Sequence, residues 1–217
     1  MTGTELHTVY KTKDGTIVPS VTTIIDKTLG WNKNALINWA KNSAIKGLDP
    51  DKIKRQAGDI GTLAHLIIES NLQDKPIDLL DWSVNTISIA TLASDSFFRW
   101  WEEKKLELVY SEIPLVSETY LFGGTIDLVA SNQYGTYLID FKTSNNIYPE
   151  HKIQISAYNY LLNEVRGIQP DETYIIKLPK EAGSCEPYNV TKKETEMGFE
   201  IFKKLLEIND IRERLGW

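Results

Sequence analysis

The chain of 217 residues contains a single cysteine, Cys185. One thiol cannot form an intramolecular disulfide framework, and it cannot supply the several thiolates that hold structural zinc or an iron–sulfur cluster. The length and the 41% hydrophobic content are instead sufficient for one ample core, or for one core with a helical subdomain. We therefore expect one compact unit of the size of an enzyme.

Long hydrophobic runs are also missing from the chain. No apolar stretch approaches the roughly 20 residues that are needed to span a bilayer. The N-terminal segment MTGTELHTVYKTKDG has neither the hydrophobic centre of a signal peptide nor an Arg-rich transit pattern. These absences predict a cytoplasmic protein.

Positive charge is scarce as well, because 24 Lys and Arg residues face 30 Asp and Glu residues and give a net charge of −6. This balance argues against a protein that coats nucleic acid non-specifically, since such binding depends on many cationic side chains. Between residues 31 and 60, however, six basic side chains outnumber three acidic ones. This modest basic surface would suit a nuclease, but on charge alone a pair of ordinary solvated helix faces is the favoured interpretation.

Residues 121–142, LFGGTIDLVASNQYGTYLIDFK, predict the β-hairpin around which the candidate site is organised. Two apolar, β-rich runs flank a polar segment with the composition of a turn. In the second run the side chains alternate, so Asp140 and Lys142 lie on one face of one strand. Asp127 lies in the first run behind two glycines, and folding of the hairpin can bring it near Asp140.

Two carboxylates and a lysine at the ends of adjacent strands are suited to phosphodiester hydrolysis. Such a set can hold a divalent cation and can orient or polarise a water beside it. On spacing alone, a surface ion pair that contributes less than about 1 kcal/mol is the simpler interpretation, because Asp-x-Lys is common on solvated strand faces. The remainder of the chain has to decide between these interpretations.

The N-terminal part predicts a short hairpin followed by helices. A strong turn signal lies within residues 8–18, and Ser20 is a candidate N-cap for the helix that follows. Hydroxyl groups at a helix start can also bind phosphate, but capping is the favoured role. Helical spacing continues over residues 33–46 and 50–72.

The second of these helices carries a candidate metal ligand. His65 and Glu69 are four residues apart and share one helix face, and Gly61 one turn earlier allows close packing. A lone histidine in an apolar helix is usually a core residue, so this spacing alone does not assign a ligand. Likewise Trp31 and Trp39 can stack on unpaired bases, but their spacing favours a core position.

Downstream, the pattern predicts alternating strands and helices. The pair Gln154 and Tyr158 projects from one helix face and can hydrogen-bond a phosphate or the lysine; a half-buried surface pair is the alternative. The expected elements are a helix over 84–106 with core aromatics, a strand that contains Glu112, the hairpin, a helix over 149–165, strands near 172–179 and 188–190, and a helix over 192–213.

The candidate residues occur in a characteristic order. They are Gly61-x-x-x-His65, Glu112, Gly124-x-x-Asp127, Asp140-x-Lys142 and Gln154-x-x-x-Tyr158. This order resembles the PD-(D/E)XK nuclease superfamily, in its RecB-like branch, over roughly residues 19–160. The segments at residues 19–23 and 140–144, PSVTT and DFKTS, look most similar to phage-type relatives of the mitochondrial genome maintenance exonuclease.

The resemblance implies a fold. The expected class is α/β (α+β), a restriction-endonuclease-like core with a mixed central β-sheet flanked by helices and an N-terminal helical region. We expect residues 1–217 to form a single nuclease domain. Its hairpin and helical region would span residues 1–106, and its sheet core and C-terminal helices residues 107–217.

The resemblance also implies a role for each candidate residue. Asp127, Asp140 and Lys142 would be catalytic, the lysine orienting the attacking water or stabilising charge on the phosphate. The metal, Mg²⁺ or Mn²⁺, would be bound by His65, Asp127, Asp140 and the backbone carbonyl of Phe141. The substrate would be contacted by Gln154, Tyr158, Ser20, Thr22, Thr143 and Ser144, and Glu112 would be an accessory acid. One histidine among carboxylates favours Mn²⁺ without excluding Mg²⁺.

The combined pattern predicts a metal-dependent deoxyribonuclease without an iron–sulfur cluster. An exonuclease that acts on single-stranded DNA or DNA ends, in replication, recombination or repair in a bacterial or phage-infected cell, is favoured. The alternatives are a structure-specific endonuclease and a nucleic-acid-binding module that does not cleave, although a pure binder would not need the carboxylates and the lysine. No helicase motif Gly-x-x-x-x-Gly-Lys-Ser/Thr is present, so any helicase or replication partner would be a separate protein.

Overall fold

The computed structural model describes residues 8–217. Residues 1–7, on which part of the signal-peptide interpretation falls, lie outside the described residues. The elements in chain order are β1 (Tyr10–Lys11), β2 (Ile17–Val18), α1 (Val21–Thr28), α2 (Lys33–Ile45), α3 (Pro50–Leu72), α4 (Val84–Lys104), β3 (Glu107–Ser117), β4 (Phe122–Asn132), β5 (Gly135–Lys142), α5 (Pro149–Arg166), β6 (Glu172–Lys177), β7 (Glu186–Asn189) and α6 (Lys192–Leu215). The expected hairpins, helices and strands are therefore confirmed, with bounds that differ by a few residues.

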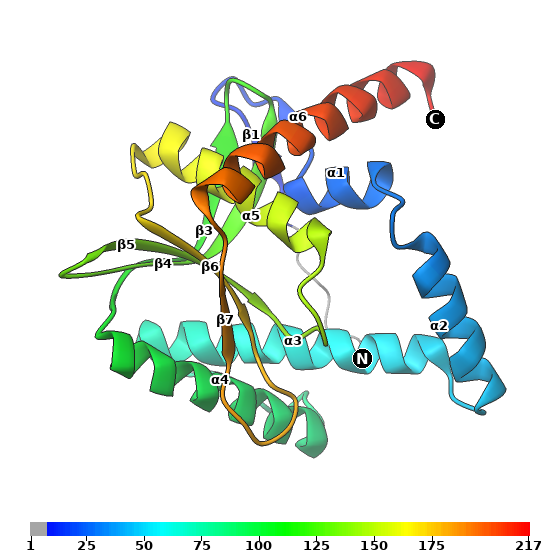
Figure 1. The fold of residues 1–217 in the computed structure, drawn as a ribbon, viewed down its shortest axis with the longest axis vertical. Coiled ribbons are helices and arrows are strands. Elements are labelled where there is room, and N and C mark those ends of the chain that lie inside the picture. The colour runs from blue at the N-terminus through cyan, green and yellow to red at the C-terminus, as the bar shows by residue number, and fades with distance from the viewer. Residues whose placement is uncertain (1–7) are drawn as a thin grey trace.

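A five-stranded sheet in the order β3-β4-β5-β6-β7 forms the centre of the molecule (Figure 1). The pairs β3–β4, β4–β5 and β6–β7 are antiparallel, whereas β5 and β6 are parallel and are connected by the crossover helix α5. This mixed sheet flanked by helices confirms the expected fold class.

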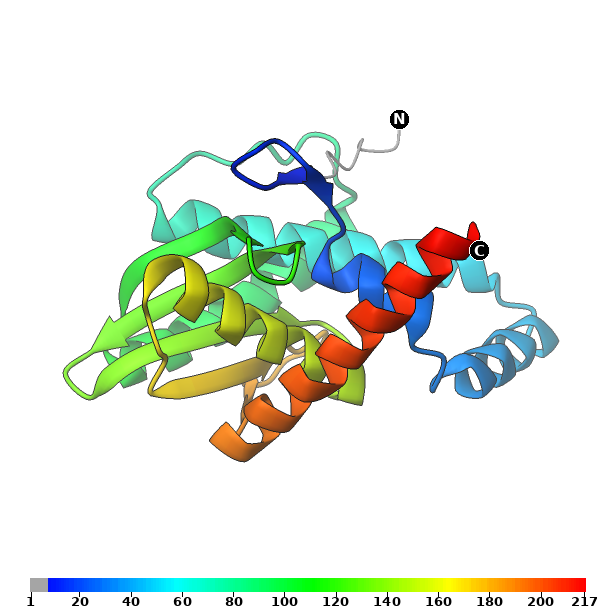
Figure 2. The ribbon, with the colours of Figure 1, turned by 90° about the horizontal axis from the view of Figure 1, so that it is seen from above.

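Helices cover both faces of the sheet, as Figures 1 and 2 show. On one face, α1, α5 and α6 bury an apolar cluster that includes Ile24, Leu161 and Phe202. On the other face, α3 and α4 bury a second cluster around Leu63 and Phe97. Because both faces are covered, the central strands are apolar on both sides, and the polar groups that do lie within them require a specific explanation.

The aromatic residues of α4 belong to the core, as the sequence predicts. Phe97 is fully buried and its ring lies edge-on to that of Phe141, with 4.8 Å between the ring centroids. Trp100 is 8% exposed, and Phe98 and Trp101 pack against the same cluster. This cluster supports the strand that carries the candidate lysine.

The core prediction is wrong for Trp31 and Trp39, whose exposed fractions are 62% and 39%. Helix α2 lies beside one end of α3, whereas the β4–β5 turn lies near the other end (Figure 2). None of the described helices or strands forms a layer over α2 there. Within the described part of α2, only Ser43 is buried. Apolar spacing predicts a helix here correctly, but it cannot show whether another element lies opposite.

Ser20 caps α1, as expected, because its hydroxyl accepts a hydrogen bond from the backbone N–H of Thr23 at 3.0 Å. Its backbone also forms an isolated bridge to Gly123. Across residues 8–217, none of the helices combines the length and apolar character needed to cross a bilayer.

A polar network joins α5, β7 and α6. Lys152 Nζ donates hydrogen bonds to Glu194 Oε1 at 2.8 Å and to Tyr188 Oη at 2.6 Å, and Tyr188 Oη donates to the same carboxylate at 2.8 Å. The hydrogen bond from Lys152 is the main reason that the pKa of Glu194 is lowered to about 2 from its ordinary 4.5. Ionised Glu194 therefore stabilises the fold above about pH 4.5, and this contribution is lost as the pH falls toward 2.

Replacing Glu194 with Gln is expected to lower the melting temperature at pH 7 by about 2–4 °C, and by less at pH 3, where the wild-type carboxylate is already losing its charge. This corresponds to about 1 kcal/mol, because the two side chains are about one-third exposed and solvent screens their charges. Thermal unfolding at both pH values measures the difference. Glu200→Gln is the matched control, since its pair with Lys203 lies on the exposed surface of α6; an equal effect from this control would contradict the prediction.

Candidate functional site

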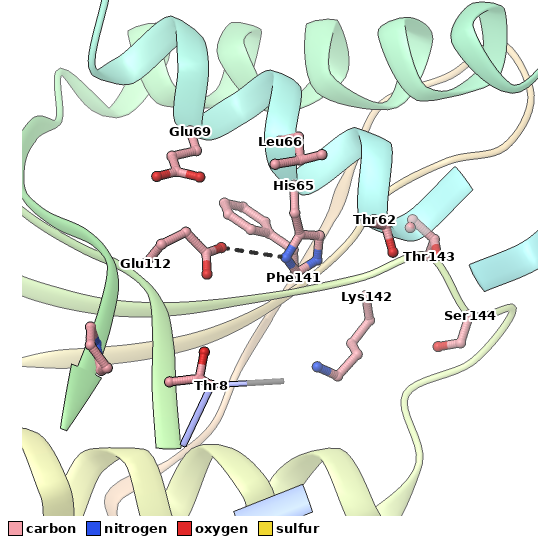
Figure 3. Close-up of a pocket in the computed structure, with 12 residues that line it drawn as sticks. Thr8, Thr62, His65, Leu66, Glu69, Glu112, Phe141, Lys142, Thr143 and Ser144 are labelled. Atoms are coloured by element: carbon pink, nitrogen blue, oxygen red, sulfur yellow. Dashed lines mark ion pairs between the residues drawn. The ribbon is translucent and has the colours of Figure 1, made fainter. Parts of the chain in front are cut away.

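A cleft of about 820 Å³ opens where α3 lies beside the middle of β3 and the end of β5 (Figure 3). Its walls come from four parts of the chain that are distant in sequence. The lining residues are Thr8, Gly61, Thr62, His65, Leu66, Glu69, Glu112, Pro114, Phe141, Lys142, Thr143 and Ser144. Half of the twelve candidate site residues therefore line this cleft: His65, Glu112, Phe141, Lys142, Thr143 and Ser144.

Three potential metal ligands converge at this cleft: His65, Glu112 and Asp127. Nδ1 of His65 lies 3.8 Å from Oε1 of Glu112 and 3.7 Å from Oδ2 of Asp127. One donor atom from each residue lies within 4.8 Å of the other two. An imidazole and two carboxylates at this spacing can share a divalent cation.

The backbone of β3 is unusual at Glu112, where φ is +48°. A residue with a side chain seldom adopts this conformation, and its cost is of order 1 kcal/mol or more. The ladder skips this position, since Ser111 pairs with Leu128 and Ile113 with Ile126. The missing pair of the ladder is therefore Glu112 with Asp127, whereas the register shift between β3 and β4 lies between Leu108 and Tyr110.

The alternation of side chains in β4 is broken around Asp127, the residue opposite Glu112. Ile126 packs in the cluster beneath α5 and α6, whereas Leu128, two residues later, packs in the cluster against α3 and α4. In a regular strand both side chains would point to the same face. This local change of face removes Asp127 from the two cores and places its carboxylate beside His65.

The charges of the group influence one another. Burial alone would lower the pKa of His65, but the carboxylates of Asp127 and Glu112 more than compensate, so this pKa is raised. Burial raises the pKa of Asp127, although the positive charges of His65 and Lys142 oppose the shift. Negative charge is thus held at an electrostatic cost, and a bound cation would relieve this cost.

Asp140 and Lys142 point to the same side of β5, as the period of two predicts, and they form an ion pair with 2.6 Å between Nζ and Oδ2. Asp140 is fully buried, and neither of its carboxylate oxygens has a hydrogen bond of good geometry within the described residues. Burial raises the pKa of Asp140, against the opposing effect of Lys142. A buried carboxylate with unused acceptor capacity is a group that a cation or a proton donor would satisfy.

Phe141 connects the ion pair to the metal-ligand group. Its backbone N–H donates a hydrogen bond to Oδ2 of Asp127 at 2.9 Å, and its ring lies edge-on to that of His65. The loop that follows β5 approaches α3 closely. A Cβ atom at Gly61 would lie only 3.1 Å from Oγ1 of Thr143 in this loop. Gly61 therefore allows the close packing that the sequence suggested.

Gln154 and Tyr158 also lie together, as expected from their spacing. Nε2 of Gln154 donates to the Tyr158 hydroxyl at 2.9 Å. The phenol is buried, which raises its pKa well above the ordinary value and keeps it protonated. Its ring packs against Gly124, where a Cβ atom would lie 2.7 Å from the ring. One of the two glycines before Asp127 thus makes room for the tyrosine.

The structure does not bring every predicted residue to the cleft. Ser20 and Thr22 are absent from its lining; Ser20 caps α1, and the Thr22 hydroxyl lies 3.1 Å from that of Ser20. Thr143 and Ser144 do line it. Asp140 lies outside the group of three potential ligands, whereas Glu112, expected only as an accessory acid, belongs to it.

Two further polar residues at the cleft, Thr8 and Thr62, were not identified from the sequence. Thr62 precedes His65 by three residues, so helical spacing could have indicated it. No comparable signal marks Thr8, because its position depends on how the N-terminal hairpin packs. Only the tertiary structure places Thr8 at the cleft.

No protein-family model matches the chain, and no curated protein matches it. Among solved structures, a protein from Eubacterium rectale provisionally described as an exonuclease is similar, with a TM-score of 0.43, 15% identity, and coverage of 84% of this chain and 67% of that one. LHK-Exo in complex with dAMP gives a TM-score of 0.35 and 16% identity, and the match covers 74% of this chain and 91% of LHK-Exo. SSO0001 gives a TM-score of 0.34 and 13% identity, and the match covers 69% of this chain and 70% of SSO0001. Similarity at this level assigns no activity, so the functional argument rests on the site itself.

Proposed function

We propose that the chain is a metal-dependent deoxyribonuclease of the PD-(D/E)XK type, in the RecB-like branch, and that it acts as an exonuclease on single-stranded DNA or DNA ends. One observation carries this proposal. The ligand group of His65, Glu112 and Asp127 adjoins the buried ion pair of Asp140 and Lys142 at one open cleft. A merely structural ion pair would need no group of ligands beside it.

The donor set fits a hard divalent cation, Mg²⁺ or Mn²⁺. His65, Glu112 and Asp127 would hold it, and Asp140 and the carbonyl oxygen of Phe141 would complete the set. Oδ1 of Asp140 supports this fit, because within the described residues it is buried without a hydrogen bond, whereas Oδ2 is paired with Lys142. When bound, such a cation offsets the negative charge of a phosphodiester and lowers the pKa of a water molecule.

The remaining residues would bind and orient the substrate. The ammonium of Lys142 would orient the attacking water or stabilise the charge that develops on the phosphate, while Asp140 holds the lysine in place. The hydroxyls of Thr143 and Ser144 would contact the strand at the cleft. The Gln154–Tyr158 pair would position the strand or Lys142, and Ser20 and Thr22 would contact it from the start of α1.

This proposal treats residues 1–217 as one nuclease domain that works in the cytoplasm of a bacterial or phage-infected cell, in replication, recombination or repair. A separate helicase or replication protein would supply partially unwound DNA. A structure-specific endonuclease is the second candidate, because the same residues would hydrolyse an internal phosphodiester by the same chemistry.

Linear and circular single-stranded DNA distinguish the two candidates. We expect purified protein to degrade end-labelled linear single strands with Mn²⁺ or Mg²⁺, to leave circular strands intact, and to be inactive with EDTA. Cleavage of the circle would make the protein an endonuclease. Binding of DNA without any cleavage, on single strands and duplexes alike, would contradict the proposed hydrolysis and favour a binding module.

A further inference from the structure

Helix α2 and its flanking turns, residues 28–48, form an exposed projection that we call the α2 arm. It extends from the end of α3 that is farther from the β4–β5 turn (Figure 1). Its apolar side chains are largely solvent-exposed, including Leu36 at 53% and Ile37 at 63% in addition to the two tryptophans. Exposed apolar residues at this density indicate a surface with a binding role.

The charge of the α2 arm contrasts with that of the rest of the chain. Lys33, Lys41 and Lys46 lie within residues 28–48, and no Asp or Glu does. The arm therefore carries +3 in a chain whose net charge is −6. A cationic surface that also presents indole rings is complementary to a single strand, whose phosphates are anionic and whose bases can stack.

The α2 arm is linked to the cleft along one face of α3. A second cavity of about 470 Å³ is lined by Asp51, Lys54, Arg55, Gly58, Asp59 and Thr62. Thr62 also lines the candidate active cleft, so the two cavities adjoin. From Lys54 to His65 the helix rises by about 16 Å, at about 1.5 Å per residue. A strand held in the cleft can therefore continue past Lys54 and Arg55 toward the arm.

We propose that the α2 arm and the adjoining face of α3 bind the part of a single-stranded DNA that lies outside the cleft. The lysines neutralise phosphates, and Trp31 and Trp39 stack on unpaired bases. This inference rests on the proposed nuclease function and extends it, because it assigns preference for long unpaired strands to a surface separate from the chemistry. A protein partner or a lipid surface would also suit a basic, apolar helix, but neither would account for the continuity with the cleft.

Substitutions on the arm test the proposal with little risk to folding, because the side chains are exposed. The test protein carries Trp31→Ala and Trp39→Ala, and Tyr134→Ala is the matched control, since Tyr134 is 79% exposed at the opposite end of the molecule in the β4–β5 turn. Fluorescence anisotropy with EDTA present measures binding of oligothymidylates of about 30 and about 5 nucleotides, so that binding is measured without cleavage.

The double substitution is expected to weaken binding of the long strand by about 10-fold for each stacked base, and to weaken binding of the short strand by less, because five nucleotides make fewer contacts along the arm. Tyr134→Ala should change neither. Lys33→Glu with Lys41→Glu should also reduce the salt dependence of binding to the long strand, since each lost phosphate contact lowers the slope by about 0.7. Unchanged affinity for the long strand in both arm variants would overturn the proposal.

The binding assay tests the proposal for the α2 arm, and the cleavage assay tests the nuclease proposal, so either proposal can be contradicted without the other. If the wild-type protein cleaves DNA but the arm variants bind long strands normally, the arm proposal is wrong and the nuclease proposal stands. If no protein cleaves but the arm variants lose binding, the nuclease proposal is wrong and the arm still binds single strands. Binding of the arm to anionic lipid vesicles or to a protein, with no effect of the substitutions on DNA, would assign the surface to that other occupant.

Discussion

Replacing Lys142 with alanine is expected to reduce DNA cleavage by about 100- to 1000-fold, which is the typical cost of removing one group that stabilises charge in a transition state. Among the residues that the structure describes, Lys142 is the only lysine that lines the candidate cleft. Its Nζ atom contacts Asp140 and is 2.6 Å from that carboxylate. Initial rates with Mn²⁺, together with circular dichroism of each protein, measure the effect and verify the fold.

Lys177 provides a matched control for this substitution. It lies directly across from Lys142 in the parallel β5–β6 register, has a similar side-chain exposure of 22% against 17%, and forms its own ion pair with Glu186. Lys177→Ala should therefore retain cleavage within about two-fold, since it removes a lysine from the same sheet without touching the cleft. Equal loss in the two variants would mean that Lys142 acts through stability alone.

The Lys142 variant also leaves a buried carboxylate without its partner, which can cost about 3–5 kcal/mol. A second protein with Lys142→Ala and Asp140→Asn removes this unpaired charge. We expect the double variant to regain thermal stability but not cleavage. Recovery of cleavage together with stability would show that neither side chain takes part in the chemistry.

Mn²⁺ is expected to raise the melting temperature of the wild-type protein by about 5–10 °C at 100 times its dissociation constant. A ligand at this concentration raises the free energy of unfolding by about 2.7 kcal/mol. For a chain of this length, each kcal/mol raises the melting temperature by about 2–4 °C. Glu112→Gln and Asp127→Asn should each abolish most of the increase, because each replaces a charged carboxylate of the group of three with a neutral amide, which binds a cation more weakly. EDTA should reverse the increase in the wild type.

Glu69→Gln is the matched control for metal binding. Glu69 lines the same cleft, but it lies outside the group of three ligands and its carboxylate accepts a hydrogen bond from Gln73. This variant should keep the full Mn²⁺-dependent increase. Loss of the increase in Glu69→Gln, with retention in Glu112→Gln, would place the cation elsewhere in the cleft.

Much of the fold could be predicted because it depends on local patterns. The alternation in β5 places Asp140 beside Lys142, and a hydroxyl before an apolar helix caps α1 through Ser20. The helical spacing of Gln154 and Tyr158 likewise predicts their hydrogen bond. In each case, the relevant period or cap is contained within a few residues of sequence.

The remaining features depend on tertiary structure. Glutamate has no special preference for the positive φ that Glu112 adopts, so its sequence neighbours do not indicate that it joins His65. The change of face between Ile126 and Leu128 is equally invisible in an apolar run. Trp39 has the spacing of a core residue, but no other layer lies opposite the α2 arm.

The two-sided covering of the sheet has a consequence for biosynthesis. His65 is delivered by the α3 layer, whereas Asp127 and Lys142 come from the sheet that is synthesised later. Contacts between segments so distant in the chain carry a loop-closure cost, which slows their formation. The ligand group therefore comes together only when α3 packs on the sheet. A partly folded chain in which α3 has not packed on the sheet therefore lacks the assembled group of ligands.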